Sequence, residues 1–288
     1  MIAILQREIG SYFKGVLGYL ISAFVLVFAG IYCMAYNLSG YYANFEYVLS
    51  SIAFIYLVAV PIISMRAMAE EKRQRTDQLL YSLPIRLSDV VFGKYLAMLV
   101  GLAVPTFIMA LYPLVLSQWG NITFAAAYGA LIAFFLLGAC LLSIGLFISS
   151  VTDSQVAAAV ITLVAMLLLY FMSSLASYVS TDASSSLTAL CVLAVIAAAL
   201  LWLLTKNPIV SVIFGALAIG GLMMWYQSDV TAFSGLFASI MTSISVFDRF
   251  YTFVDGVFDL TAVVYYLSII GVFLFLTVQS LEKRRWIE

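Results

Sequence analysis

The sequence has no histidine, and its three cysteines are Cys33, Cys140 and Cys191. Each cysteine lies within an apolar run, which gives neither a disulfide framework nor a cluster with metal-ligand spacing. The lack of histidine removes the commonest general base and the commonest metal ligand. We therefore expect no metal, no cofactor and no catalytic residue on this chain.

Charged residues are also scarce. They make up 9% of the 288 residues, whereas hydrophobic residues make up 65%. A soluble domain has about a quarter charged and about half apolar residues, so this composition predicts an integral membrane protein surrounded by the lipid bilayer. The 13 basic residues are too few and too scattered to form a nucleic-acid-binding face, which excludes nucleic acid as a main partner.

Long apolar runs predict the membrane spans, because a helix needs about 20 apolar residues to cross a hydrocarbon core of about 30 Å. Such runs occupy residues 16–36, 47–65, 95–117, 122–149, 156–178 and 260–281. Two shorter runs, 187–204 and 208–225, predict a helical hairpin. The predicted fold is an all-α polytopic membrane protein of about eight spans, with a six-span core and an inserted hairpin at 187–225. The alternative is six spans, with the hairpin lying shallow in the membrane.

The basic residues predict the orientation of the spans. With a cytoplasmic N-terminus, twelve of the 13 Lys and Arg residues lie in cytoplasmic segments and Arg249 lies outside, in agreement with the positive-inside rule. Both termini are then cytoplasmic. No charged residue falls within the eight apolar runs, although proton and cation relays usually need such residues. This absence disfavours a secondary transporter or a proton-driven pump.

The first 14 residues have the pattern of an amphipathic helix. Apolar residues recur at helical spacing on one face, and polar residues occupy the other. The pattern predicts a helix at 1–14 that lies in the cytoplasmic interface of the membrane. An N-terminal extension of the first span would have the same periodicity.

The longest predicted cytoplasmic stretch, residues 66–94, holds six basic and four acidic residues. Glu71 and Arg75 are four positions apart and Glu70 and Arg73 are three apart, and such pairs support a solvent-exposed helix. We interpret the stretch as a short helix and turn that dock against a protein. The alternative, that the charges only set the topology, explains the basic residues but not the two glutamates.

The same stretch ends with an apolar pair and a helix break. Leu79 and Leu80 give the helix an apolar end, and Pro84 breaks it because proline lacks an amide hydrogen. Ser88 is then the predicted N-cap of the next helix, with Asp89 near its positive end.

A predicted external segment, residues 227–259, lies before the last span. Its apolar residues have helical spacing and predict one amphipathic helix through Phe233, Leu236, Phe237, Ile240, Met241, Ile244 and Phe247. An interfacial helix that fastens the outer surface is the alternative to a functional role. A group of tyrosines marks the outer membrane boundary, with substrate stacking as the less favoured interpretation: Tyr32, Tyr36, Tyr41, Tyr42 and Tyr47.

Several segments carry a family resemblance. AEEKRQRTDQLLYSLP at residues 69–84, followed by VFGKYLA at 91–97, resembles the cytoplasmic loop of the ABC-2 type permeases, most closely their gliding-motility branch. GLFISSVTDSQVAAA at 145–159 is similar to the family's turn between its fourth and fifth spans. Arg75 and Gln78 stand where the family usually has Gly and Glu, and the hairpin exceeds the family's six-span core.

The resemblance implies that residues 1–288 form one type-2 ABC exporter transmembrane domain. Such a chain is a permease subunit that exports or extracts a substrate across the bacterial cytoplasmic membrane. Its expected partners are a cytoplasmic ABC ATPase dimer and a second permease copy or a paralogous membrane subunit. The sequence has no GxxxxGK[ST] motif, so ATP and Mg²⁺ are expected on the partner ATPase and this chain is not expected to be an enzyme.

The resemblance also assigns two sets of site residues. The ATPase-coupling set within the loop at 66–94 is Glu70, Glu71, Arg73, Leu79, Leu80 and Pro84. The exit-side gate before the last span is Phe250, Phe253, Gly256 and Asp259. Two other function classes stay open, an ATP-independent secondary transporter or channel for an apolar solute, and a membrane scaffold that only anchors partners.

Overall fold

The computed structural model describes residues 2–74, 86–118, 120–205 and 208–285. Within these ranges the chain consists of helices joined by turns and short connections, and no strand occurs. Seven helices in the described ranges are long and apolar enough to cross a membrane, or eight if the bent pair Thr231–Ile244 and Val246–Val254 is one span. The predicted all-α fold with about eight spans is confirmed.

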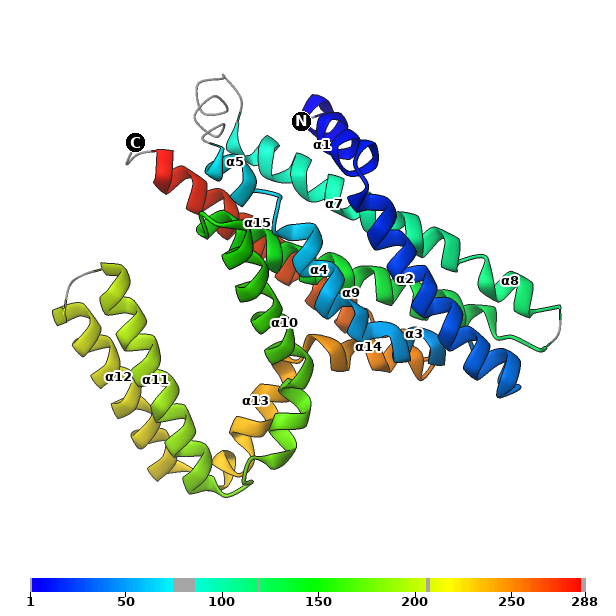
Figure 1. Cartoon of the computed structure of the whole chain (residues 1–288). Helices are drawn as coiled ribbons and strands as arrows, with labels where there is room; N and C mark the ends of the chain where they lie inside the picture. Colours follow the sequence, from blue (N-terminus) through cyan, green and yellow to red (C-terminus); the bar gives the residue numbers. More distant parts are fainter. Residues whose placement is uncertain (1, 75–85, 119, 206–207, 286–288) are drawn as a thin grey trace. The chain divides into compact units, whose positions relative to one another are not determined.

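The chain forms two compact units, one of Met1–Leu169 with Val246–Glu288 and one of Tyr170–Ser245. The first unit begins with α1 (Ile2–Lys14), α2 (Leu17–Cys33), the π-helix η1 (Met34–Ser39), α3 (Glu46–Ile52), the 3₁₀ turn η2 (Ala53–Ile55), α4 (Tyr56–Ser64) and α5 (Ala69–Arg73). It continues with α7 (Leu87–Met109), α8 (Tyr112–Leu116), α9 (Phe124–Val151), the first part of α10 (Gln155–Tyr178), α14 (Val246–Val254) and α15 (Leu260–Arg285) (Figure 1).

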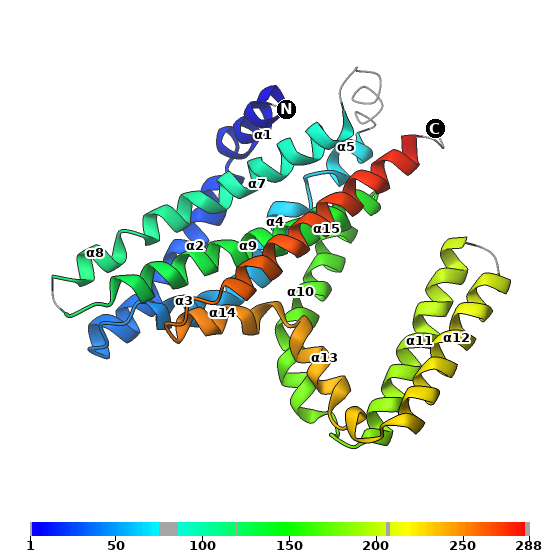
Figure 2. The ribbon, with the colours of Figure 1, turned by 180° about the vertical axis from the view of Figure 1, so that it is seen from behind.

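Helix α9 is the core of the first unit. It packs against α4, α7, α14 and α15, and α15 runs alongside it in both views of the ribbon (Figure 2). The stretch from Leu137 to Leu142 is buried at every position. A helix that is apolar on all sides is a buried helix, which agrees with the long apolar run in the sequence.

Two glycines let other helices approach α9 closely. A Cβ atom on Gly138 would lie 2.5 Å from Leu102 Cδ2 and 2.8 Å from Tyr56 Cζ, and one on Gly145 would lie 2.5 Å from Ser64 Oγ. Positions seven apart share a helix face, so the two glycines form one smooth strip along α9. Small residues have this role where helices pack in membranes.

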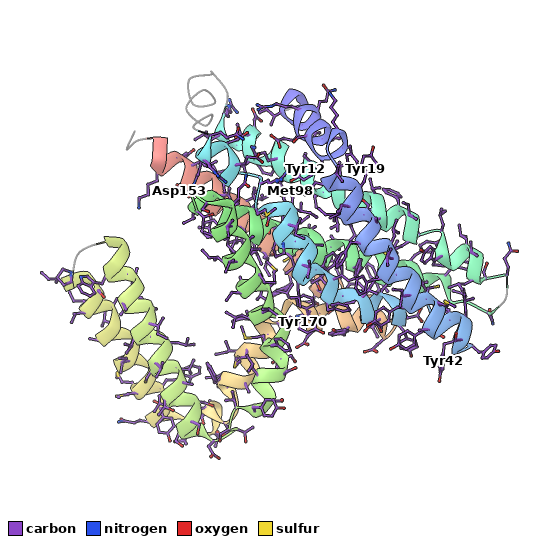
Figure 3. The ribbon with its side chains drawn as sticks, in the orientation of Figure 1. Tyr12, Tyr19, Tyr42, Met98, Asp153 and Tyr170 are labelled. Carbon is purple, nitrogen blue, oxygen red and sulfur yellow. The ribbon has the colours of Figure 1, made fainter. Side chains whose placement is uncertain are left out.

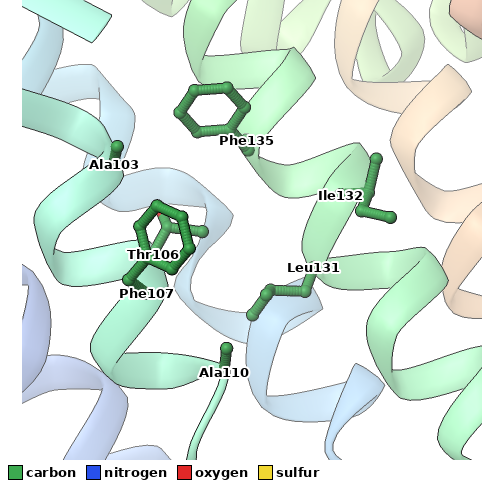
Figure 4. A pocket seen from close by; sticks show the side chains of 7 residues that line it. All are labelled: Ala103, Thr106, Phe107, Ala110, Leu131, Ile132 and Phe135. Carbon is green, nitrogen blue, oxygen red and sulfur yellow. The ribbon is translucent and has the colours of Figure 1, made fainter. Parts of the chain in front are cut away.

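A cavity of about 230 Å³ lies between α7 and α9 (Figure 4). It is lined by Ala103, Thr106, Phe107, Ala110, Leu131, Ile132 and Phe135. The Thr106 hydroxyl donates to the carbonyl oxygen of Leu102 at 2.9 Å. Because Thr106 satisfies its hydroxyl within its own helix and the other lining side chains are apolar, the cavity offers no polar selectivity.

The second unit contains the predicted hairpin. Besides the end of α10 it consists of α11 (Ala183–Thr205), α12 (Pro208–Ser228), the 3₁₀ turn η3 (Thr231–Phe233) and α13 (Leu236–Ile244). Helices α11 and α12 pack along each other. Phe233 is fully buried, with its ring 5.0 Å from that of Trp225 and 5.4 Å from that of Tyr226. Two packed helices therefore occupy the hairpin predicted at 187–225, and α11 begins four residues earlier than predicted. Helix α12 contains one of the span-length helices, Ser211–Ser228, whereas the apolar part of α11, Ala183–Ala199, is shorter. Lys206, which was predicted to lie between them, is outside the described residues.

Local boundaries differ from the prediction at two places. The amphipathic helix predicted from Phe233 to Phe247 is divided among η3, α13 and α14. The breaks are at Gly235, with φ 72°, and at Ser245, where the backbone is extended with ψ 113°. The N-cap of α7 is Arg86, with ψ 136°, so Ser88 lies inside the first turn and does not cap the helix. By contrast, the helix predicted at 1–14 forms as predicted and is not an extension of the first span, since α1 ends at Lys14 and α2 begins at Leu17.

Candidate functional site

A buried lysine connects three helices at one end of the first unit. The side chain of Lys94, on α7, is 3% exposed. Its Nζ lies 2.8 Å from Oε1 of Glu71 on α5 and 3.1 Å from Oε1 of Glu8 on α1. It also donates to the carbonyl oxygen of Ala67 at 2.7 Å. These three acceptors match the three hydrogens of the ammonium group, and we call the four residues the Lys94 cluster.

Electrostatics makes the Lys94 cluster sensitive to the loss of any member. Each of the two carboxylate side chains is 16% exposed, so the cluster is largely shielded from water. Removal of one partner from a buried ion pair costs about 3–5 kcal/mol, because the other charge stays buried without compensation. Lys94 also keeps two carboxylates together that would otherwise repel each other. The position of α5 relative to α1 and α7 therefore depends on this one ammonium group.

A second lysine joins α5 to the end of α9. Lys72 is 8% exposed, and its Nζ donates to the carbonyl oxygens of Ser150 and, at 3.4 Å, Thr152. Nζ also lies 3.8 Å from Oδ1 of Asp153, which is 74% exposed. The last carbonyls of a helix have no partner inside the helix and carry partial negative charge. Lys72 therefore caps the C-terminus of α9.

A serine on α9 in turn caps the start of α5. The Ser149 Oγ atom, on α9, accepts hydrogen bonds from the backbone N–H groups of Met68 and Ala69, each at 3.1 Å. These groups lie at the start of α5, where Met68 provides no side-chain cap of its own. Ser149 is fully buried, so water cannot replace it. We call Met68, Ala69, Lys72, Ser149 and Ser150 the α5–α9 junction.

Helix α1 is attached at the same end of the unit. The buried Tyr12 hydroxyl donates to the carbonyl oxygen of Ile63 on α4 at 3.0 Å. Burial, and next the nearby Glu8 carboxylate, raise the pKa of Tyr12 well above its usual value, so the phenol stays a donor at neutral pH. Tyr12 and Asp153 lie toward one end of the first unit, whereas Tyr42 lies at the other (Figure 3).

Comparison with known families decides what kind of protein carries this site. The model that describes ABC-2 family transporter proteins matches residues 9–208, more than half of the chain. The chain belongs to the ABC-2 transporter family. It is thus a multi-pass membrane protein and a permease subunit of an ABC transporter, and the family implies an ABC ATPase as partner. A comparison with curated protein sequences found no match.

The matched range includes the α5–α9 junction and most of the Lys94 cluster of this ABC-2 permease. Lys94, Glu71 and Ser149 lie within residues 9–208, and Glu8 is the residue just before that range. The family resemblance inferred from the segments at 69–84, 91–97 and 145–159 is therefore confirmed at the level of the ABC-2 family.

The structure places the predicted coupling residues of the permease differently from the sequence pattern. A turn at residues 65–68 separates α4 from α5, but the stretch Glu46–Arg73 is one span-length helix, so α5 extends the second span as predicted. Glu71 was predicted to lie on a solvent-exposed face, but its side chain is 16% exposed and its carboxylate contacts the buried Lys94; its predicted partner, Arg75, is not among the described residues. Glu70 is half-buried and accepts from Gln74 Nε2 at 3.4 Å, and Arg73 is exposed. The remaining members, Leu79, Leu80 and Pro84, and also Arg75, lie outside the described residues.

The predicted gate residues have two different surroundings. Phe250 and Phe253 are buried on α14, and the Phe250 ring lies 6.0 Å from that of Phe134 on α9. Gly256 has φ +80° in the turn after α14. Asp259 Oδ1 accepts from the Thr261 N–H at 2.8 Å at the start of α15, and hydrogen bonds from Thr261 hold the pKa of Asp259 below its usual value. These contacts are those of a packed core and of a helix cap, and the gate role stays a prediction.

The sequence interpretation missed the lysines and the serine that join the helices of the permease. It treated Lys72 and Lys94 as topology-setting charges and placed Lys94 just outside the third span, whereas Lys94 lies inside α7. The burial of Glu46 was missed as well: this residue is the first of α3 and is 5% exposed. The signal that pointed to Ser149 was the match at 145–159, which was used only to recognise the family. No local periodicity connects that segment to α5.

Proposed function

We propose that the ABC-2 permease receives the movement of its ATPase through α5 and transmits it to α9, the core helix of the first unit. The observation that carries this proposal is the single Lys94 ammonium group that contacts Glu8, Glu71 and Ala67. A five-residue helix is too short to hold its position alone. Its contacts with α1, α7 and α9 hold it, so a displacement of α5 moves those helices with it.

The α5–α9 junction makes the connection between α5 and α9 rigid. Ser149 caps α5 and Lys72 caps α9, so neither helix end can separate without leaving buried polar groups unpaired. Unpaired buried groups cost about 1–3 kcal/mol each. A push on the loop at 66–94 is therefore transmitted as a shift of packed helices rather than absorbed by local rearrangement. Packed interfaces switch between discrete arrangements in this way.

The finer assignments belong to the same proposal. The segments at 69–84 and 91–97 favour the gliding-motility branch, and the family analogy favours export or extraction across a bacterial cytoplasmic membrane by two membrane subunits over an ATPase dimer. The second membrane subunit is another copy or a paralogue. ATP and Mg²⁺ then bind the ATPase. The segment from Leu79 to Pro84 is the proposed contact with the ATPase, and the positive-inside rule places it in the cytoplasm.

The test compares Lys94→Met with Lys14→Met in membranes that contain the complete transporter. Met keeps the length of the lysine stem but removes the ammonium group, and Lys14 is a matched control because it undergoes the same substitution at an exposed position at the end of α1. We expect Lys94→Met to insert in the membrane and to retain less ATPase after purification, or to uncouple hydrolysis from transport. Lys14→Met should behave as the parent does.

A charge exchange keeps this test informative if Lys94→Met folds poorly. The double variant Lys94→Glu with Glu71→Lys restores one ion pair across α5 and α7, and we expect it to recover part of the lost coupling. Parent-like ATPase retention and coupling in Lys94→Met would refute the role of the cluster. Transport that persists without any ATPase would instead favour the secondary-transporter alternative.

A further inference from the structure

The end of the first unit opposite the Lys94 cluster contains an unusual loop. The chain leaves α2 through the π-helix η1 and reaches α3 through residues 40–45. π-Helical turns are rare in proteins, and many of those that do occur lie at functional sites. Tyr41 has φ +58° and is 91% exposed. This left-handed conformation is strained for a bulky residue and persists only where the surroundings impose it.

The loop borders a cavity of about 380 Å³. Its walls are Asn37, Leu38, Tyr41, Tyr42, Ala43, Leu116 and Gly120. The volume lies within the range of small-molecule sites. Among the described residues, the walls carry two tyrosine rings and an amide but no charged side chain. They therefore offer neither a cation for a phosphate nor a carboxylate that would form a direct ion pair.

Asn37 contributes an acceptor that lacks a donor. The residue is 7% exposed, and its Nδ2 donates to the carbonyl oxygens of Tyr42 at 2.6 Å and Asn44 at 3.4 Å. These two carbonyls determine the orientation of the amide, because the opposite orientation would place oxygen against oxygen. The Oδ1 atom is buried and accepts no hydrogen bond from the described residues. Such a group calls for a donor from outside the chain.

The charge behind the cavity indicates which donor fits. Asn44 Nδ2 donates at 2.6 Å to Oε1 of Glu46, a carboxylate that is 5% exposed and forms no ion pair with the described residues. The hydrogen bonds from Asn37 to Asn44 and from Asn44 to Glu46 connect the cavity wall to this negative charge. A positively charged N–H donor is favoured by the carboxylate, by the amide oxygen and by the faces of the tyrosine rings.

We propose that this cavity binds a primary ammonium group, carried by a lipid headgroup or by a free amine. Tyr41 and Tyr42 flank the ammonium group, Asn37 Oδ1 accepts one of its hydrogens, and Leu38 and Leu116 contact the attached carbon chain. Because Oδ1 is buried, the ligand can reach it only if residues 40–44 move. The loop changes conformation at Tyr41, where the backbone is strained. The exposed tyrosines place the site at a membrane boundary, where they commonly lie.

The experiment measures lipid retention by the full-length protein, using phosphatidylethanolamine, phosphatidylcholine and phosphatidylglycerol as probes. Native mass spectrometry after equal exposure should show phosphatidylethanolamine retained at least about tenfold better than the others, the factor expected for one charge-assisted hydrogen bond. Equal retention of phosphatidylcholine, which has the charge but no N–H, would overturn the proposal. Equal retention of phosphatidylglycerol would do so as well, because it would show general solvation by lipid.

Two variants and a control locate the binding. Asn37→Leu should abolish the preference. Tyr41→Gly should abolish it too while keeping the fold, because glycine adopts φ +58° without strain. Tyr47→Leu is the control, since Tyr47 is 48% exposed and does not line the cavity. A preference that survives both Asn37→Leu and Tyr41→Gly would place binding elsewhere and refute the site.

Ethanolamine in solution distinguishes the two sources of the ammonium group. If millimolar ethanolamine raises the melting temperature of the parent protein and displaces the lipid, the site takes free amines. If ethanolamine has no effect while phosphatidylethanolamine is retained, the site requires the lipid. Both results support recognition of an ammonium group, whereas the absence of any effect from either probe contradicts it.

Discussion

Ser149→Ala should loosen the start of α5 without disturbing α9. In the structure its Oγ accepts the N–H groups of Met68 and Ala69 at 3.1 Å in a site that water does not reach. Loss of a helix cap costs about 0.5–2 kcal/mol, and two buried donors lose their acceptor here, so we take about 1–2 kcal/mol. That free energy corresponds to about a 5- to 30-fold change in a local opening equilibrium.

Hydrogen exchange measured on peptides that cover residues 66–74 tests this magnitude directly, because it reports local opening. The matched control is Ser150→Ala. The Ser150 hydroxyl donates to the Phe147 carbonyl of its own helix at 2.7 Å, and only its backbone oxygen contacts Lys72. We expect faster exchange at 66–74 in Ser149→Ala and parent-like exchange in Ser150→Ala. Unchanged exchange in Ser149→Ala, or the same acceleration in both variants, would refute the capping argument.

Three further predictions concern helix packing, the energy source and the topology. Gly145→Ala should destabilise the protein by about 1–3 kcal/mol, because the new Cβ would lie 2.5 Å from Ser64 Oγ; thermal unfolding in detergent measures it, with Gly129→Ala, where a Cβ meets nothing within 4 Å, as the control. Transport should depend on ATP and resist proton ionophores; collapse of transport with the proton gradient while ATP is present would contradict this. Cysteine labelling should find position 206 cytoplasmic and position 249 external; labelling of position 206 from outside would leave six spans.

Most of the fold could be predicted from the sequence. Apolar runs of about 20 residues have few alternatives in a membrane, because each backbone N–H and C=O must be paired within its own segment. The helices α9, α10 and α15 accordingly begin within two residues of their apolar runs. The segments around residues 69–97 and 145–159 were also sufficient to recognise the ABC-2 family.

Helix boundaries were less predictable where the chain makes local choices. Ser88 has the chemistry of an N-cap, yet the extended backbone at Arg86 starts α7 two residues earlier. The apolar periodicity from Phe233 to Phe247 passes through Ser245 without interruption, although the backbone there is extended. Periodicity reports which residues share a face, and it does not report where a hydrogen-bonded helix ends.

The candidate site depended on tertiary structure. Helical spacing suggested for Glu71 only a partner four residues away, and it did not predict the contact of its carboxylate with Lys94, which also binds Glu8 at a separation of 86 positions. Ser149 caps an N–H group 81 positions away. Sequence periodicity reveals partners only within one helix, because those distances follow from helix geometry. Partners on different helices follow from how α1, α5, α7 and α9 pack, and their packing depends on side-chain shape along the whole of α9.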